Sequence, residues 1–172
     1  MAAERTGVVT FKGAPMTLVG NQVGVGDTAP GFTVTGTDMS EVKLSDAKGK
    51  VLLLSIVPSL DTSVCSIQTR RFNDEAKSLG EDVEVLTISM DLPFAQARWL
   101  EAESVEHLDT ASDYKNREFG ENWGLYVKEL GLLARSVFVV DKNGKVSYRE
   151  IVPEMTDEPT YDAAIDAVKK AL

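Results

Sequence analysis

The strongest indication of the fold comes from Val51-Leu52-Leu53-Leu54-Ser55-Ile56-Val57, together with the residues that follow as far as Gly80. The run 51–57 is almost continuously apolar, which is typical of a central strand buried on both faces. Beyond the loop that begins at Pro58, apolar residues recur at helical spacing from Val64 to Leu79, and Gly80 supplies a stop. The sequence therefore predicts a strand in the middle of a sheet, followed by a helix.

The remaining elements follow outward from this unit. Pro93 can begin a helix, and Asn143-Gly144 between two apolar runs is a strong hairpin signal. The expected elements are a hairpin over about 7–19, a strand at 32–35, a strand over 83–90, a helix over 94–103, a hairpin of strands 136–140 and 146–152, and a closing helix from Pro159 to Leu172. Residues 109–133 show no clean period, so no element is assigned there.

The order of these elements describes a three-layer α/β unit with a mixed central sheet, because at least one antiparallel pair joins the strand-helix repeats. A length of 172 residues corresponds to one domain, and no repeat or linker divides it. We therefore expect a single domain over 1–172, with the N-terminal β-hairpin as part of it.

The charge balance excludes several partners. The chain has 18 Lys and Arg against 27 Asp and Glu, a formal net charge of −9, which repels nucleic-acid phosphates and anionic membranes. The longest apolar runs, such as 51–54 and 137–140, fall far short of the roughly 20 residues that span a bilayer. The first residues carry the acid Glu4 and no apolar run typical of a signal peptide, so a cytoplasmic location is expected.

The cysteine count restricts the chemistry. One Cys cannot form a disulfide within the chain, and one Cys with one His cannot supply the four ligands of a structural zinc site. No metal or other cofactor is expected. Any redox cycle of this thiol needs a reactant from outside the chain.

The lone Cys65 stands in the first turn of the helix that follows the buried strand. Unpaired cysteines are commonly small buried hydrophobic residues without chemistry. At a helix N-terminus, however, free N–H groups and the helix dipole favour the thiolate, and reactive cysteines in such settings have pKa values of about 3.5 to 7.5. This setting makes Cys65 the candidate nucleophile.

Three further residues are candidates for the same site. Thr62 precedes Cys65 by one turn, so its hydroxyl is expected beside the sulfur, as a donor to the thiolate or as a helix cap. Pro58 ends the strand and fixes the entry of the loop, for which turn formation alone is a sufficient reason. Arg135 adjoins a buried strand, where a cation needs an anion or water; it either reaches solvent or points at the Cys65 sulfur.

These residues resemble a known family. Pro58-Ser59-Leu60-Asp61-Thr62-Ser63-Val64-Cys65 matches the Pro-x-x-x-Thr-x-x-Cys signature of the peroxiredoxins. The N-terminal hairpin, Asp91-Leu92-Pro93-Phe94-Ala95-Gln96 and Leu133-Ala134-Arg135 are similar to the thiol peroxidase subfamily. The resemblance covers nearly the whole chain. It implies a thioredoxin-like fold, with Cys65 as the peroxidatic cysteine and Pro58, Thr62 and Arg135 as its companions. It also implies a homodimer that reduces hydrogen peroxide and organic hydroperoxides.

The chain departs from this subfamily at one position. Members generally carry a resolving cysteine on the helix after the Asp-Leu-Pro-Phe segment, and Leu100 stands at the corresponding place. We favour a natural variant over an introduced substitution. The expected cycle uses one cysteine, whose sulfenic acid is reduced by an external thiol, either a thioredoxin-like protein or a small thiol.

Two rival functions remain open at this point. A Cys-His hydrolase would need the sole histidine, His107, beside Cys65, whereas a surface histidine is the simpler interpretation. A non-enzymatic thioredoxin-fold module, for redox sensing or chaperone-like binding, would explain the missing second cysteine by a loss of activity. Core packing is the commoner role for a single aromatic residue. Four of them could nevertheless form an apolar rim or a dimer patch: Phe94, Trp99, Trp123 and Tyr126.

Overall fold

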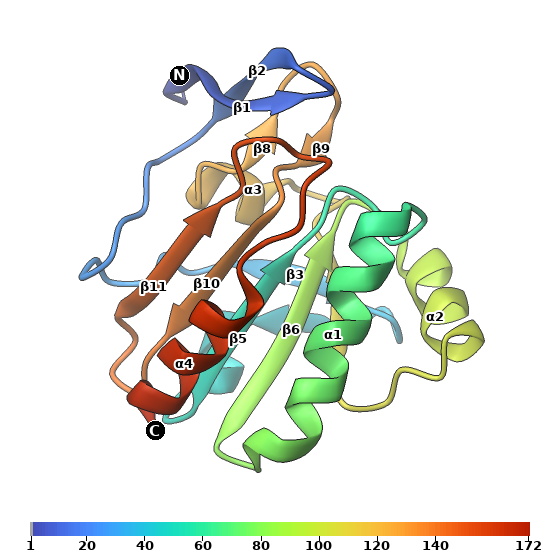
Figure 1. Ribbon diagram of the computed structural model, residues 1–172, viewed down its shortest axis with the longest axis vertical. Helices are drawn as coiled ribbons and strands as arrows, with labels where there is room; N and C mark the ends of the chain where they lie inside the picture. Colours follow the sequence, from blue (N-terminus) through green and yellow to red (C-terminus); the bar gives the residue numbers. More distant parts are fainter. Residues whose placement is uncertain (1) are drawn as a thin grey trace.

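The computed structural model of the protein describes residues 2–172 as two sheets with helices packed on both faces of the larger sheet (Figure 1). The strands are β1 (Glu4–Phe11), β2 (Ala14–Val19), β3 (Thr33–Gly36), β4 (Glu41–Lys43), β5 (Val51–Ile56), β6 (Val83–Ser89), β7 (Asp109–Ser112), β8 (Tyr126–Val127), β9 (Leu132–Leu133), β10 (Ser136–Val140) and β11 (Val146–Ile151). The helices are a 3₁₀ turn (Leu44–Ala47), α1 (Ser63–Leu79), α2 (Pro93–Ala102), α3 (Glu118–Asn122) and α4 (Tyr161–Ala171).

The larger sheet has seven strands in the order β11-β10-β5-β6-β7-β3-β4. Strands β5, β6 and β7 pair in parallel, and the other neighbours pair antiparallel. One hydrophobic core joins the sheet to α1 and α4, which lie on the near face in Figure 1, and a second core joins the opposite face to α3. The predicted α/β fold with a mixed sheet is confirmed.

Strand β5 and helix α1 form the unit that the sequence pattern indicates. All six residues of β5 are buried, and the strand lies between β10 and β6. Helix α1 ends at Gly80, whose φ of 84° is a backbone conformation that a residue without a Cβ adopts at little cost. The β5–α1 connection therefore places Cys65 at the carboxyl end of the central strands.

Residues 109–133, where no period was visible, contain four short elements: β7, α3, β8 and β9. Elements of two to five residues are too short to repeat an apolar pattern. Strands β8 and β9 extend the N-terminal hairpin into a second sheet, in the order β1-β2-β8-β9. The sequence predicted the hairpin but not this second sheet.

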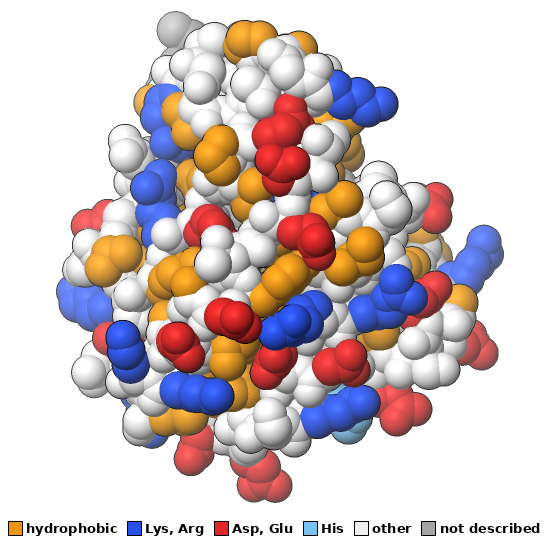
Figure 2. Space-filling model, in the orientation of Figure 1, with side chains coloured by type: hydrophobic (Ala, Val, Ile, Leu, Met, Phe, Trp, Pro, Cys, Tyr) orange, Lys and Arg blue, Asp and Glu red, His pale blue; other side chains and the backbone are white. Residues whose placement is uncertain are grey.

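The charged side chains are interspersed on the surface. Figure 2 shows Lys and Arg among Asp and Glu over the face that carries α1 and α4, where Arg71 pairs with Glu75 and Asp162. Among residues 2–172, no helix has the length and apolar character needed to cross a bilayer.

A carboxylate ties the β1–β2 hairpin to the segment after β11. The Glu154 carboxylate accepts five hydrogen bonds, which come from the Thr10 hydroxyl, the Thr156 hydroxyl and the backbone N–H groups of Lys12, Gly13 and Thr156. These donors, the Thr156 and Gly13 N–H groups foremost, lower the pKa of Glu154 from 4.5 to about 2.

We expect the hairpin tip to detach in acid. Because the pKa of Glu154 is depressed in the folded protein, its stabilising effect is complete above about pH 4.5 and is lost as the pH falls toward 2. The protection factor of the Gly13 amide, which compares its exchange with the intrinsic rate at the same pH, should therefore fall over this range in the native protein. Glu154→Gln should show the faster exchange already at pH 7, whereas Glu81→Gln, at an exposed site, should behave like the native chain. Equal protection of Gly13 in all three proteins at pH 7 would contradict this role.

Candidate active site

Cys65 is completely buried in the first turn of α1. Its side chain packs in a small apolar cluster with Val57 and Leu60, against which Trp99 of α2 also packs. The sulfur is therefore removed from bulk water and bounded by the loop between β5 and α1 on one side and by α2 on another.

Arg135 reaches the sulfur from the segment between β9 and β10. Its Nη2 lies 3.2 Å from Cys65 Sγ, and the residue is only 2% exposed. Of the two positions open to this side chain, solvent or the sulfur, the structure shows the second. A buried guanidinium needs an anionic or strongly polar partner, so this geometry sets a fixed positive charge against the thiol.

Two further groups hold the Arg135 guanidinium in place. Arg135 Nη1 donates to Gln68 Oε1 at 3.0 Å, and Arg135 Nε donates to the carbonyl of Met155 at 2.8 Å. Gln68 is itself buried and donates through Nε2 to the hydroxyl of Ser55 at 2.9 Å. The planar, rigid guanidinium thus has three anchors, one of which is the sulfur.

Neither of these anchors was predicted from the sequence. Gln68 follows Cys65 by three residues, so helical spacing places it on the same face, and this was the available signal. The Met155 contact is made by a backbone carbonyl, which no side-chain pattern marks.

Thr62 lies beside the site, but its hydroxyl proton does not point at the Cys65 sulfur. Its hydroxyl donates to the carbonyl of Ser59 at 3.0 Å instead of to the Cys65 sulfur, and its side chain does not cap α1. Because the proton is used within the loop, the lone pairs of this oxygen are free to accept a hydrogen bond.

Asp91 holds the loop that carries Thr62. Its carboxylate accepts from the Ser59 hydroxyl at 2.7 Å and from the Leu60 amide at 2.8 Å, as well as from Ser89 at 2.7 Å. Asp91 follows β6, so the loop before α1 is tied to the carboxyl end of the neighbouring strand. The hydrogen bonds to Asp91 thus fix the position of the loop that precedes Cys65.

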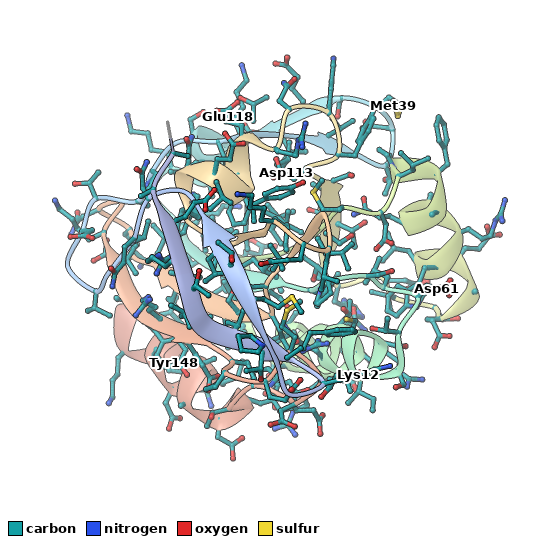
Figure 3. All side chains as sticks on the ribbon, turned by 90° about the horizontal axis from the view of Figure 1, so that it is seen from above. Lys12, Met39, Asp61, Asp113, Glu118 and Tyr148 are labelled. Carbon is teal, nitrogen blue, oxygen red and sulfur yellow. The ribbon has the colours of Figure 1, made fainter. Side chains whose placement is uncertain are left out.

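Pro58, Thr62 and Arg135 line one cavity of about 330 Å³. The opposite wall comes from the hairpin tip and from the segment after β11, with Phe11, Lys12 and Met155. In Figure 3, which looks down on this end, Lys12 marks the hairpin tip. The structure therefore brings together all four residues singled out in the sequence, and apolar side chains lie beside Arg135 in the cavity.

The remaining candidates lie away from this constellation. His107 is exposed, and its backbone N–H donates to Asn73, about two turns along α1 from Cys65. Leu100 is half-buried and packs into the core between the sheet and α1. Trp123 is buried in the opposite core, Tyr126 is half-buried, and Phe94 is 65% exposed.

Comparisons with known proteins all find redoxin-type proteins, and the most similar relatives named here are thiol peroxidases. The Redoxin family model matches residues 24–165. A thiol peroxidase of Bacillus subtilis is 57% identical over 94% of this chain and 96% of its own length, and one of Listeria innocua is 58% identical over 95% and 98%.

The solved structures agree with this result. A peroxiredoxin-like protein from Aquifex aeolicus, 43% identical, superposes with a TM-score of 0.91 over 99% of both chains. A thiol peroxidase from Chromobacterium violaceum, 19% identical, has a TM-score of 0.82 over 94% of this chain and 95% of its own. These neighbours confirm the thioredoxin-like fold.

Proposed function

Since this chain belongs to the Redoxin family and is a thiol-dependent peroxidase, we propose that Cys65 is its peroxidatic nucleophile, with Pro58, Thr62 and Arg135 completing the catalytic site. The observation that carries this assignment is the Arg135–Cys65 contact of 3.2 Å, in which Arg135 also lines the cavity with Pro58 and Thr62. A guanidinium held against a buried sulfur favours the thiolate, which is the reactive form of cysteine. The thiol is also the single one in the chain.

The first half of the reaction follows from this geometry. The thiolate attacks one oxygen of the peroxide in line with the O–O bond, so an S–O bond forms as the O–O bond breaks. Negative charge develops on the departing oxygen, which leaves as water or an alcohol after it takes up a proton. Arg135 and the free N–H groups of the first turn of α1 stabilise this charge, and Thr62 accepts the hydrogen bond of the bound hydroperoxide.

The cavity supports a role with organic hydroperoxides as well as hydrogen peroxide. Phe11, Pro58, Val64 and Met155 give it apolar walls, and a volume of about 330 Å³ exceeds what hydrogen peroxide needs. An alkyl group would bury its apolar surface there, whereas hydrogen peroxide gains only the polar contacts.

The second half of the reaction requires an external thiol. The product at Cys65 is a sulfenic acid, and the chain holds no other cysteine that could condense with it. We infer a one-cysteine cycle, in which a thiol from outside the chain forms a mixed disulfide with Cys65 and a second thiol releases it.

Mass spectrometry tests the assignment and the cycle together. After one equivalent of hydrogen peroxide, the chain should gain the mass of one oxygen atom at Cys65, and added thiol should convert this product into a mixed disulfide and then the reduced chain. Cys65→Ser should show neither product and should lack peroxide turnover. A native chain that stays unmodified at Cys65 while it consumes peroxide would refute the proposal.

We also infer a homodimer in the cytoplasm. Leu92 and Phe94, at the start of α2, are 52% and 65% exposed, which leaves neighbouring apolar side chains available to a second copy. A cycle that depends on an external thiol needs a reducing thiol pool, and the cytoplasm supplies one.

A further inference from the structure

A second cavity lies on the other side of the loop that precedes α1. Its volume is about 460 Å³, and its lining includes Leu60 and Asp61 of the loop together with Arg98 and Trp99 of α2. Leu60 and Trp99 are also the side chains that pack around Cys65. The same two residues therefore separate the sulfur from this cavity. Figure 3 shows Asp61 beside α2, whereas Lys12 marks the tip of the hairpin that borders the first cavity.

The reduction of a sulfenic acid sets a direction of approach. The incoming thiolate attacks the sulfur in line with the S–O bond that breaks, from the side opposite the oxygen. That oxygen is delivered through the cavity lined by Thr62 and Arg135, so the reductant must arrive from the flank away from Arg135. Leu60 and Trp99 pack around the sulfur and also line the second cavity, whose lining includes neither Arg135 nor Thr62.

We propose that this second cavity binds the reductant, a low-molecular-weight thiol that carries both a carboxylate and an ammonium group. The inference rests on the proposed one-cysteine cycle. It assigns the two half-reactions to two separate cavities, one on either side of the loop that ends at Thr62.

The charges around the second cavity determine the class of thiol. Glu103 is paired with Arg70 at 3.2 Å, and the Asp91 carboxylate is occupied by three donors. Arg98 and Asp61, by contrast, are exposed and have no ion pair within the part of the chain that the structure describes. One unpaired guanidinium and one unpaired carboxylate complement a zwitterionic ligand.

The size of the cavity favours a small molecule over a protein. About 460 Å³ lies within the range of small-ligand pockets, roughly 300 to 1,000 Å³. Small side chains at Ala95 and Ala102 keep the face of α2 open on this side. Because Leu60 and Trp99 both line this cavity and pack around Cys65, a ligand bound there reaches the sulfur when one of these side chains moves.

The reductive steps balance with two molecules of the thiol. The first thiolate forms an S–S bond to Cys65 as the S–O bond breaks, and the hydroxyl group leaves as water with the proton that the thiol gave up. The second thiolate attacks the ligand sulfur of this mixed disulfide. The S–S bond to Cys65 then breaks, the thiolate of Cys65 is restored and the disulfide of the small thiol departs.

Stopped-flow measurement of each half-reaction on the full chain tests the proposal. The chain is first oxidised with one equivalent of hydrogen peroxide and then reduced with glutathione, which is zwitterionic, or with 2-mercaptoethanol, which is uncharged. Arg98→Gln should slow reduction by subsaturating glutathione roughly fivefold or more, with no change for 2-mercaptoethanol or for the oxidation step. Arg71→Gln, which removes an arginine that forms its ion pairs elsewhere, is the matched control.

A second variant tests the cavity without changing its charge. Ala95→Phe places a large side chain at an exposed position of α2 that lines the cavity, so it should slow reduction by glutathione and leave oxidation by peroxide intact. The proposal is wrong if both variants are reduced by glutathione at the native rate, or if a protein dithiol reduces the native chain and neither small thiol does. Failure of the native chain to form a sulfenic acid would instead refute the proposed function itself.

Discussion

Replacement of Arg135 by methionine is expected to slow the oxidation of Cys65 by hydrogen peroxide about 100- to 1,000-fold. Methionine fills much of the buried volume but provides no charge and no donor. The sulfur would lose its contact with Nη2, and the developing charge on the departing oxygen would lose its cation. The loss should therefore fall on the chemical step with every peroxide.

The rate of Cys65 oxidation should depend on the orientation of the Arg135 guanidinium as well as on its charge. The three anchors of the guanidinium are Cys65 Sγ, Gln68 Oε1 and the Met155 carbonyl, and one ammonium group cannot reproduce this planar arrangement. Arg135→Lys is therefore expected to recover only part of the lost rate.

Stopped-flow fluorescence can follow these variants, because Trp99 packs in the same cluster as Cys65 and should report its oxidation. Arg71→Met serves as the control, since it removes a surface arginine of α1 and should oxidise at the native rate. Thermal unfolding should show that Arg135→Met remains folded. A folded Arg135→Met that oxidises as fast as the native chain would remove Arg135 from the mechanism.

The parts of the fold that could be predicted are those with a complete local signal. Strand β5 combines an almost continuous apolar run, interrupted by Ser55, with Pro58 shortly after its end, and α1 combines helical spacing with a glycine stop. Strands β8 and β9 have two residues each and exist because they pair with β2 and with each other. Such tertiary pairing leaves no period in the sequence.

The residues of the site also fall into those that a local sequence pattern marks and those that it does not. Cys65 and Thr62 are visible because loop and helix place them one turn apart, but 70 positions separate Cys65 from Arg135. Only the folded sheet, which pairs β10 with β5, brings those two segments together. The direction of the Thr62 hydroxyl could not be predicted either, because it depends on the turn that places the Ser59 carbonyl within reach.

Because the Thr62 hydroxyl donates to Ser59 and leaves its lone pairs for a peroxide, replacement of Thr62 is also expected to slow the oxidation of Cys65 strongly. Thr62→Val keeps the shape of the side chain but removes the oxygen, so both the hydrogen bond to Ser59 and the acceptor in the peroxide cavity disappear. We expect a loss of about 100- to 1,000-fold in the rate of Cys65 oxidation, because a bound hydroperoxide would no longer be held in line with the sulfur. Thr62→Ser retains the hydroxyl and is expected to stay within about tenfold of the native rate.

The two substitutions separate the hydroxyl from the methyl group. Second-order rate constants with hydrogen peroxide and with a bulky alkyl hydroperoxide should show the same order, with native above Ser and Ser far above Val. If Ser were as slow as Val, the methyl group and its packing would carry the effect. If Val reacted at the native rate, no hydrogen bond from the peroxide to Thr62 would be needed, and the Arg135 guanidinium and the backbone N–H groups of α1 would have to orient the substrate alone.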